Sequence, residues 1–149
     1  MKSYSYKIVA QWFLSQEAMT PKKLQKLMYY FEAWGQALFS EKMIADTEFE
    51  AWVHGPVSPE LYREYKGFGW RDIPQGKNND EVFSDKVLDL LYSIWATYGD
   101  KSANELEALT HIEAPWRNAR QGYAETDNCN VKIKAEDMKE YYSSIYIGD

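Results

Sequence analysis

The chain has 149 residues, which is enough for one domain with its own hydrophobic core, and we expect residues 1–149 to form that single domain. Hydrophobic residues make up 45% and aromatic residues 16% of the sequence, which excludes intrinsic disorder as its main state. The net charge of −6 disfavours non-specific nucleic-acid binding, because that binding needs many lysines and arginines to neutralise phosphates.

The sequence also argues against a membrane protein and against a metal site. No apolar stretch approaches the roughly 18 residues of a membrane-spanning helix, and the N-terminal residues lack the apolar core of a signal peptide. We therefore expect a cytoplasmic protein without a membrane partner. The single cysteine, Cys129, excludes a disulfide framework. Histidine and cysteine spacings typical of metal sites are missing, so we expect neither a metal nor a cofactor.

Helices dominate the predicted N-terminal half. Apolar residues at three- and four-residue steps predict a first helix over 4–15 and a long amphipathic helix from Pro21 to Leu38. Thr20 is suited to cap this second helix, and a proline at the first helical position lacks only a donor that would have no partner there. The polar segment 74–80 predicts a surface loop.

Two short segments have the alternating pattern of strands. Residues 49–53 alternate between apolar and polar side chains, and the sequence at 54–56 ends that pattern. Residues 131–134 alternate as well and are the candidate partner strand. Between them, Ser58 followed by proline predicts a short helix over 59–66.

The second half of the chain is again predicted to be helical. Apolar spacing predicts a helix over 87–98, and Ser102 with Glu105 fits a capping box that starts the next one. Pro115 begins a further short helix, and residues 138–145 form the last. The predicted fold class is therefore mainly α, a compact single-domain helical fold with at most a small two-stranded β ribbon.

Three lysines lie at the start of the long helix. Lys22, Lys23 and Lys26 oppose the helix dipole, whose N-terminal end is already positive. One interpretation is a contact with an anion or an acidic partner. The alternative is a solvated face. Lys22, Lys26 and Tyr30 share one side of the helix, opposite its apolar stripe.

Two other stretches carry titratable side chains. His54 follows Trp52 in a strand-to-helix corner, where it either completes the turn or acts as a ligand or proton carrier near neutral pH. His111 and Glu113 form a titratable pair beside Trp116, which an enzyme could use for acid–base catalysis. The alternative is that the pair hydrogen-bonds a buried helix end while the tryptophan fills the core.

The aromatic content suggests a protein-binding surface. Six tryptophans and twelve tyrosines exceed what a core of this size needs, and both residue types are favoured in interfaces. Tyr141, Tyr142 and Tyr146 form a tyrosine cluster that is either partly exposed for such contacts or simply part of an amphipathic helix.

Three stretches, taken in order, resemble the Panacea domain, also called the SocA-like or GepA-like family. They are TPKKLQKLMYY at 20–30, WVHGPV at 52–57 and LTHIEAPW at 109–116, and the similarity covers about 8–120. The resemblance implies an antitoxin that binds and neutralises a toxin encoded beside it, often in a prophage or mobile element. One family member delivers its toxin to a protease, so a protease is a further implied partner.

The resemblance, together with the patterns above, marks a set of residues as family-motif or partner-binding positions. They are Lys22, Lys23, Lys26, Tyr30, Trp52, His54, Gly55, Pro56, His111, Glu113 and Trp116. Their match to the family does not by itself make them contact residues, because several could simply build the shared fold.

We predict a protein-binding antitoxin rather than an enzyme, with occlusion of a toxin surface as its mechanism. One alternative is a small enzyme that uses His111 and Glu113, with His54, in a pocket beside Trp116; these side chains would then have to converge around an open cleft. A transcription regulator is disfavoured by the acidic charge and by the lack of a basic recognition helix. A phage protein that binds a host factor is a further alternative.

Overall fold

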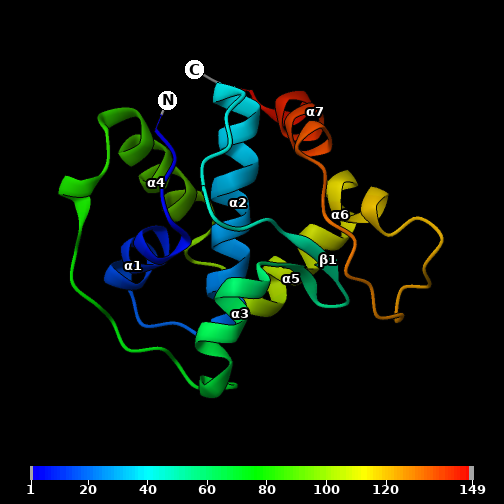
Figure 1. Cartoon of the computed structure of the whole chain (residues 1–149), viewed down its shortest axis with the longest axis horizontal. Coiled ribbons are helices and arrows are strands. Elements are labelled where there is room, and N and C mark those ends of the chain that lie inside the picture. The colour runs from blue at the N-terminus through cyan, green and yellow to red at the C-terminus, as the bar shows by residue number, and fades with distance from the viewer. Residues whose placement is uncertain (1, 148–149) are drawn as a thin grey trace.

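The computed structural model describes residues 2–147, and within them it shows a mainly α fold with one two-stranded antiparallel sheet, as predicted (Figure 1). The helices are α1 (Tyr6–Gln16), α2 (Pro21–Phe39), α3 (Pro59–Tyr65), α4 (Asp85–Tyr98), α5 (Ala103–Ile112), α6 (Ala114–Ala119) and α7 (Ala135–Ile145), and the strands are β1 (Glu50–Trp52) and β2 (Gly55–Val57). Short 3-10 turns cover Lys66–Phe68 and Asp80–Val82. None of the helices in this described part is long and apolar enough to cross a membrane.

Helix α2 is the central element of the fold (Figure 1). The Thr20 hydroxyl accepts a hydrogen bond from the Lys23 amide, so the predicted cap and the proline start are confirmed. Helices α1, α3, α4, α5 and α7 and strand β2 all pack against α2. Because neighbours surround it, α2 is buried on its polar side as well as on its apolar stripe, as expected for a core helix.

The two-stranded sheet forms between β1 and β2. Strand β2 begins within 54–56, the segment that was expected to end the strand pattern of 49–53. Glu50 pairs with Val57 and Trp52 with Gly55, which makes a hairpin over residues 50–57, here called the β-hairpin. A two-residue connection allows this pairing at a small cost in loop entropy. The expected partner segment, 131–134, does pair with β1, along its other edge, through one antiparallel bridge between Glu50 and Lys132. The Ala51 amide donates to the Val131 carbonyl oxygen, and the Ile133 amide donates to the Phe49 carbonyl oxygen, both at 2.8 Å.

The helices of the C-terminal half follow their capping signals. Ser102 and Glu105 make the predicted capping box at the start of α5. Helix α5 ends at Ile112, where Glu113 adopts an extended conformation that separates it from α6. Helix α7 packs along α2 and also contacts α6 (Figure 1). This arrangement brings the α5–α6 junction next to both α2 and the β-hairpin.

Candidate functional site

The three sequence motifs meet at the β-hairpin. The Lys26 ammonium of α2 donates a hydrogen bond to the Pro56 carbonyl oxygen at 3.2 Å. On the other side, the Trp116 indole N–H of α6 donates to the Trp52 carbonyl oxygen at 2.8 Å. The motifs from α2, the β-hairpin and the α5–α6 junction therefore form one packed unit, although they lie far apart in the sequence.

Gly55 makes the close approach of α2 and α5 to the β-hairpin possible. Its φ of +108° lies in a region that side chains with a Cβ rarely adopt. A Cβ at this position would lie 2.6 Å from Lys26 Cε and 3.1 Å from Thr110 Oγ1. The backbone conformation therefore favours glycine here, and a Cβ would in addition force the end of the Lys26 side chain to shift.

Lys26 is buried although it is a lysine. Its side chain is only 1% exposed, and among the described residues its ammonium forms no ion pair with a carboxylate. Burial lowers the pKa of Lys26 to about 7; the nearby Lys22 also lowers it, and Glu107 opposes the shift. An ammonium with one carbonyl partner in a low-dielectric site is unstable relative to water, which makes this residue unusual.

Lys22 and His54 share a carboxylate on α5. Lys22 forms an ion pair with Glu107 and donates a hydrogen bond to Asn104 Oδ1 at 2.8 Å. His54 Nδ1 lies 3.4 Å from Glu107 Oε2, and the imidazole side chain is 73% exposed. Burial raises the pKa of Glu107, but the hydrogen bonds from Lys22 and His54 outweigh it, so the pKa lies below its usual range. Glu107 is therefore already occupied by partners within the chain.

The interpretation of the lysine face as solvated is wrong. Lys23 donates to the Gly99 carbonyl oxygen at 2.7 Å, at the C-terminal end of α4, where a cation is favoured by the helix dipole. Lys22 contacts α5, and Lys26 lies under the β-hairpin. Sequence periodicity describes one helix at a time, so it could not show that this side would be covered.

Glu113 belongs to a buried tyrosine network. Its carboxylate accepts hydrogen bonds from the hydroxyls of Tyr30 at 2.8 Å and Tyr142 at 2.7 Å. The Tyr142 hydroxyl also lies 3.1 Å from the Tyr29 hydroxyl. Burial raises the pKa of Glu113, and the two tyrosine hydrogen bonds act in the opposite direction. The alternative expected from the sequence, a hydrogen bond from this pair to a buried helix end, is wrong for Glu113, whose partners are tyrosine hydroxyls and which makes no side-chain cap at the start of α6. Trp116 does lie in the core, as that alternative expected.

His111 has different neighbours from Glu113. Its ring stacks on Trp116 with centroids 3.9 Å apart and an angle of 13° between the planes. Burial lowers the pKa of His111, and its buried Nε2 has no hydrogen-bond partner among the described residues. The two side chains of the suggested acid–base pair thus do not converge on a shared cleft, which was the geometry that the enzyme alternative required. Within residues 2–147 no group of three His, Cys, Asp or Glu side chains is placed to hold a metal ion.

The comparison with protein families agrees with this geometry. The family model described as "Antitoxin SocA-like, Panacea domain" matches residues 24–117, which is more than half of the chain. The chain belongs to this family. The matched range of this Panacea domain contains Lys26, the β-hairpin and Trp116, whereas Lys22 and Lys23 precede it. Searches of the curated proteins and of the solved structures find no match.

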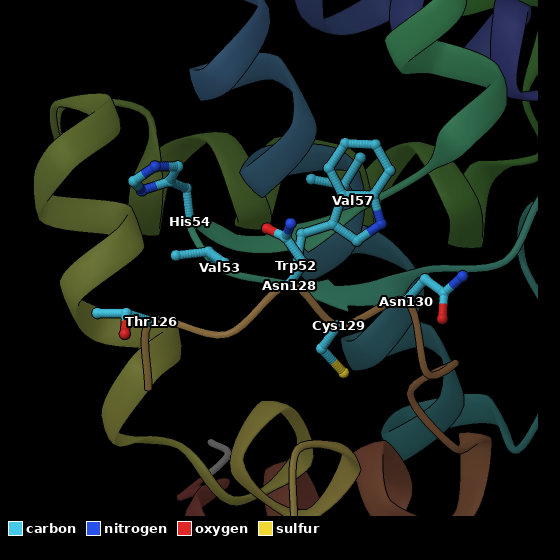
Figure 2. Close-up of a pocket in the computed structure, with 8 residues that line it drawn as sticks. All are labelled: Trp52, Val53, His54, Val57, Thr126, Asn128, Cys129 and Asn130. Carbon is cyan, nitrogen blue, oxygen red and sulfur yellow. The ribbon is translucent and has the colours of Figure 1, made fainter. Parts of the chain in front are cut away.

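Two open grooves of the Panacea domain share the β-hairpin. The first, here called the hairpin–loop groove, has a volume of about 670 Å³ and lies between the hairpin and residues 126–130 (Figure 2). The second, the α2–α3 groove, has a volume of about 470 Å³ and a mainly apolar surface. Residues from α2, the β-hairpin, α3 and the turn after α3 line it, among them Lys22, Lys26, Trp52, Leu61, Tyr62 and Trp70. Trp52, His54 and Val57 contribute to both grooves.

Most of the aromatic content serves the core rather than the surface. The tyrosine cluster at 141, 142 and 146 is partly exposed: Tyr146 is exposed and Tyr141 is half-buried, whereas Tyr142 is fully buried. Tyr29 and Tyr30 are fully buried as well. Among the aromatic side chains of residues 2–147, Trp70 is the most exposed, at 87%. Sequence reasoning missed Trp70 because it lies in a glycine-containing turn without periodicity.

Arg120 is a further residue beside the β-hairpin that the sequence analysis did not single out. It is buried and donates from Nη1 to the Ala51 carbonyl oxygen at 2.7 Å and from Nη2 to the Asp127 carbonyl oxygen at 2.6 Å. Its guanidinium also lies over the Trp116 ring, 4.9 Å from the centroid. Arg120 therefore fixes the 120–130 loop against β1 and shapes the hairpin–loop groove. Its spacing of four residues from Trp116 was the one signal that could have drawn attention to it.

Proposed function

We propose that this Panacea domain is a cytoplasmic antitoxin, encoded in a prophage or other mobile element, that neutralises a toxin encoded beside it by binding the toxin directly. Membership of an antitoxin family is the observation that carries the proposal. The open, partly apolar grooves at the β-hairpin support a protein partner, because such surfaces accept the apolar anchors of protein interfaces. The role is one of binding and not of catalysis, and it needs no cofactor.

Occlusion of a toxin surface is the mechanism that we favour. The net charge of −6 suits a basic toxin surface, and complementary charge would speed the encounter and restrict the choice of partner. In this proposal, five of the family-motif residues fall into a buried group and a groove-lining group: Lys22, Lys26, Tyr30, Trp52 and His54. Tyr30 and Lys26 are buried and support the fold, while Lys22, Trp52 and His54 line the α2–α3 groove and are the residues that we propose contact the toxin.

A growth assay tests the direct-binding role. The gene next to this one is induced alone and then together with the antitoxin, and the two proteins are isolated by affinity purification. We expect growth arrest by the neighbour alone, and rescue with a stable complex when both are present. A harmless neighbour, or rescue without any complex, would contradict direct neutralisation and favour a host factor as the partner.

Delivery of the toxin to a protease is the alternative route to rescue. The toxin's half-life, followed after translation is stopped, separates the two mechanisms. Occlusion predicts that the toxin persists in the complex at its normal level. A half-life that shortens only when this chain is present would instead establish the adaptor mechanism.

A further inference from the structure

We propose that the contact between α2 and the β-hairpin is a proton-coupled latch, which opens when water reaches Lys26 and this lysine takes up a proton. We call the contact the α2–hairpin seam. In it, Gln25 and Lys26 of α2 face Pro56 and Ser58. The observation that carries the latch is an amino group buried beneath a strand with a single polar partner. The latch is a property of the free chain and does not depend on the identity of the toxin.

The β-hairpin closes directly over the end of the Lys26 side chain. The amino group donates a hydrogen bond to the Pro56 carbonyl oxygen at 3.2 Å, and the residue is 1% exposed. The hairpin backbone lies so close that a Cβ at Gly55 would be 2.6 Å from Lys26 Cε and 3.2 Å from Nζ. One carbonyl oxygen satisfies only one of the three N–H donors of an ammonium, and burial disfavours its charge. The closed seam therefore favours the neutral amine.

The charged groups around Lys26 do not compensate an ammonium in the closed seam. Burial and the neighbouring charge of Lys22 lower the pKa of Lys26 to about 7, and Glu107 of α5 offsets this only in part. The Glu107 carboxylate is shared, because it is bound by Lys22 and approached by His54 of the β-hairpin. Helix α3 and the turn after it bring no carboxylate to the groove that Lys26 lines; their titratable side chains there are Tyr62, Tyr65 and Lys66.

A second titratable group on α5 opposes protonation of the seam. His111 has a buried Nε2 without a hydrogen-bond partner in residues 2–147. Burial lowers its pKa, Glu107 and Glu125 raise it, and the charge of Lys26 lowers it. Protons on His111 and on Lys26 therefore disfavour each other while the seam is closed. Glu113, which follows α5, is already engaged with two tyrosine hydroxyls.

Opening of the seam would restore the ordinary basicity of Lys26. The pKa of this group is about 7 in the closed seam, and its ordinary value is 10.5. Between these values opening takes up one proton, so the opening equilibrium constant rises about tenfold for each unit by which the pH falls. Below about pH 7 the lysine is protonated in both states, and this dependence levels off. Trp52, His54 and Val57 line both grooves, so the latch couples the shape of both grooves to pH.

Hydrogen exchange of the Ser58 amide measures the opening. This amide donates to Gln25 Oε1 at 2.8 Å across the seam, so it exchanges when the seam opens. Its protection factor, which removes the intrinsic pH dependence of exchange, should rise about tenfold per unit between about pH 7.5 and pH 9.5. In Lys26→Met the protection factor should exceed that of the wild type at about pH 7.5 and should change by less than about threefold over this range.

Lys66→Met is the matched control variant. Lys66 lines the same groove as Lys26 but is exposed to solvent, so its replacement should leave the pH dependence of the wild type unchanged. Buried amides of α4, such as that of Leu91, report on global unfolding and set the upper limit of protection. The Ser58 amide should exchange faster than these amides at every pH tested.

A wild-type Ser58 protection factor that does not change with pH would overturn the latch, even if Lys26→Met failed to fold. An unaltered pH dependence in Lys26→Met would overturn it as well, because the proton would then belong to another group. Equal protection of the Ser58 amide and of the α4 amides would show that the seam opens only when the whole chain unfolds. The growth assay decides separately whether the chain neutralises a toxin.

Discussion

At the scale of single residues, the most unusual feature of the molecule is the buried ammonium of Lys26. We predict that Lys26→Met stabilises the folded chain by on the order of 1–4 kcal/mol at pH 7, because it removes a poorly compensated buried charge. Methionine has a similar length and fills the same space. Urea denaturation of the variant and the wild type measures the difference. A variant less stable than the wild type would show that the lysine supports the fold.

The stability effect of Lys26 should also depend on pH. The pKa of Lys26 falls from its ordinary value of 10.5 to about 7 on folding, so between these values the unfolded chain binds more protons than the folded one. The free energy of unfolding contributed by this group therefore rises with pH across that window. We expect the advantage of Lys26→Met to be largest at pH 7 and below and to shrink steadily from pH 7 toward pH 10. An advantage independent of pH would contradict the lowered pKa.

The carboxylate of Glu113 gives a second prediction at this scale. Tyr30→Phe removes one of the two hydroxyls that hold this buried carboxylate, and we expect a loss of about 1–3 kcal/mol in the free energy of unfolding. The exposed Tyr146 provides the control, since Tyr146→Phe should change stability by less than about 0.5 kcal/mol. Urea denaturation of both variants tests the pair. Equal effects would mean that the tyrosine network adds nothing to stability.

At the scale of elements, the β-hairpin depends on its glycine. We predict that Gly55→Ala lowers the free energy of unfolding by more than about 1 kcal/mol, because Gly55 has a positive φ and an added Cβ would lie 2.6 Å from Lys26 Cε. Gly76→Ala is the matched control, as a Cβ there would meet nothing within 4 Å. Thermal melts of both variants measure the contrast. An unchanged melting temperature for Gly55→Ala would show that the β-hairpin can shift without cost.

The elements also show how far local sequence signals reach. Helices α2 and α5 were predictable because their starts are set by local hydrogen bonds, from Thr20 and from the Ser102–Glu105 capping box. The bridge between β1 and 131–134 was predictable from alternation, whereas the hairpin partner β2 was not, since a turn through His54 looks locally like the end of a strand. The burial of Lys26 was not predictable either, because α5 and the β-hairpin that cover it come from distant parts of the chain.

At the scale of the whole molecule, the three sequence motifs contribute mainly to the packing of the fold and less to a contact surface. Glu113 serves the core and Gly55 serves the close packing of the β-hairpin, while His111 stacks on Trp116. Lys26 takes part both in this unit and in the α2–α3 groove. Motif resemblance could therefore indicate the family and the place where the motifs meet. It could not indicate the groove, which depends on the exposure of Trp70.

The central claim is that the antitoxin acts by binding its toxin, and calorimetry with the purified product of the neighbouring gene tests it most directly. We predict saturable binding with a Kd below about 1 µM, as stable, specific protein complexes commonly have. The growth assay on the same pair of genes shows whether that binding accompanies rescue. Rescue of growth without measurable binding, up to about 100 µM of each protein, would contradict the account.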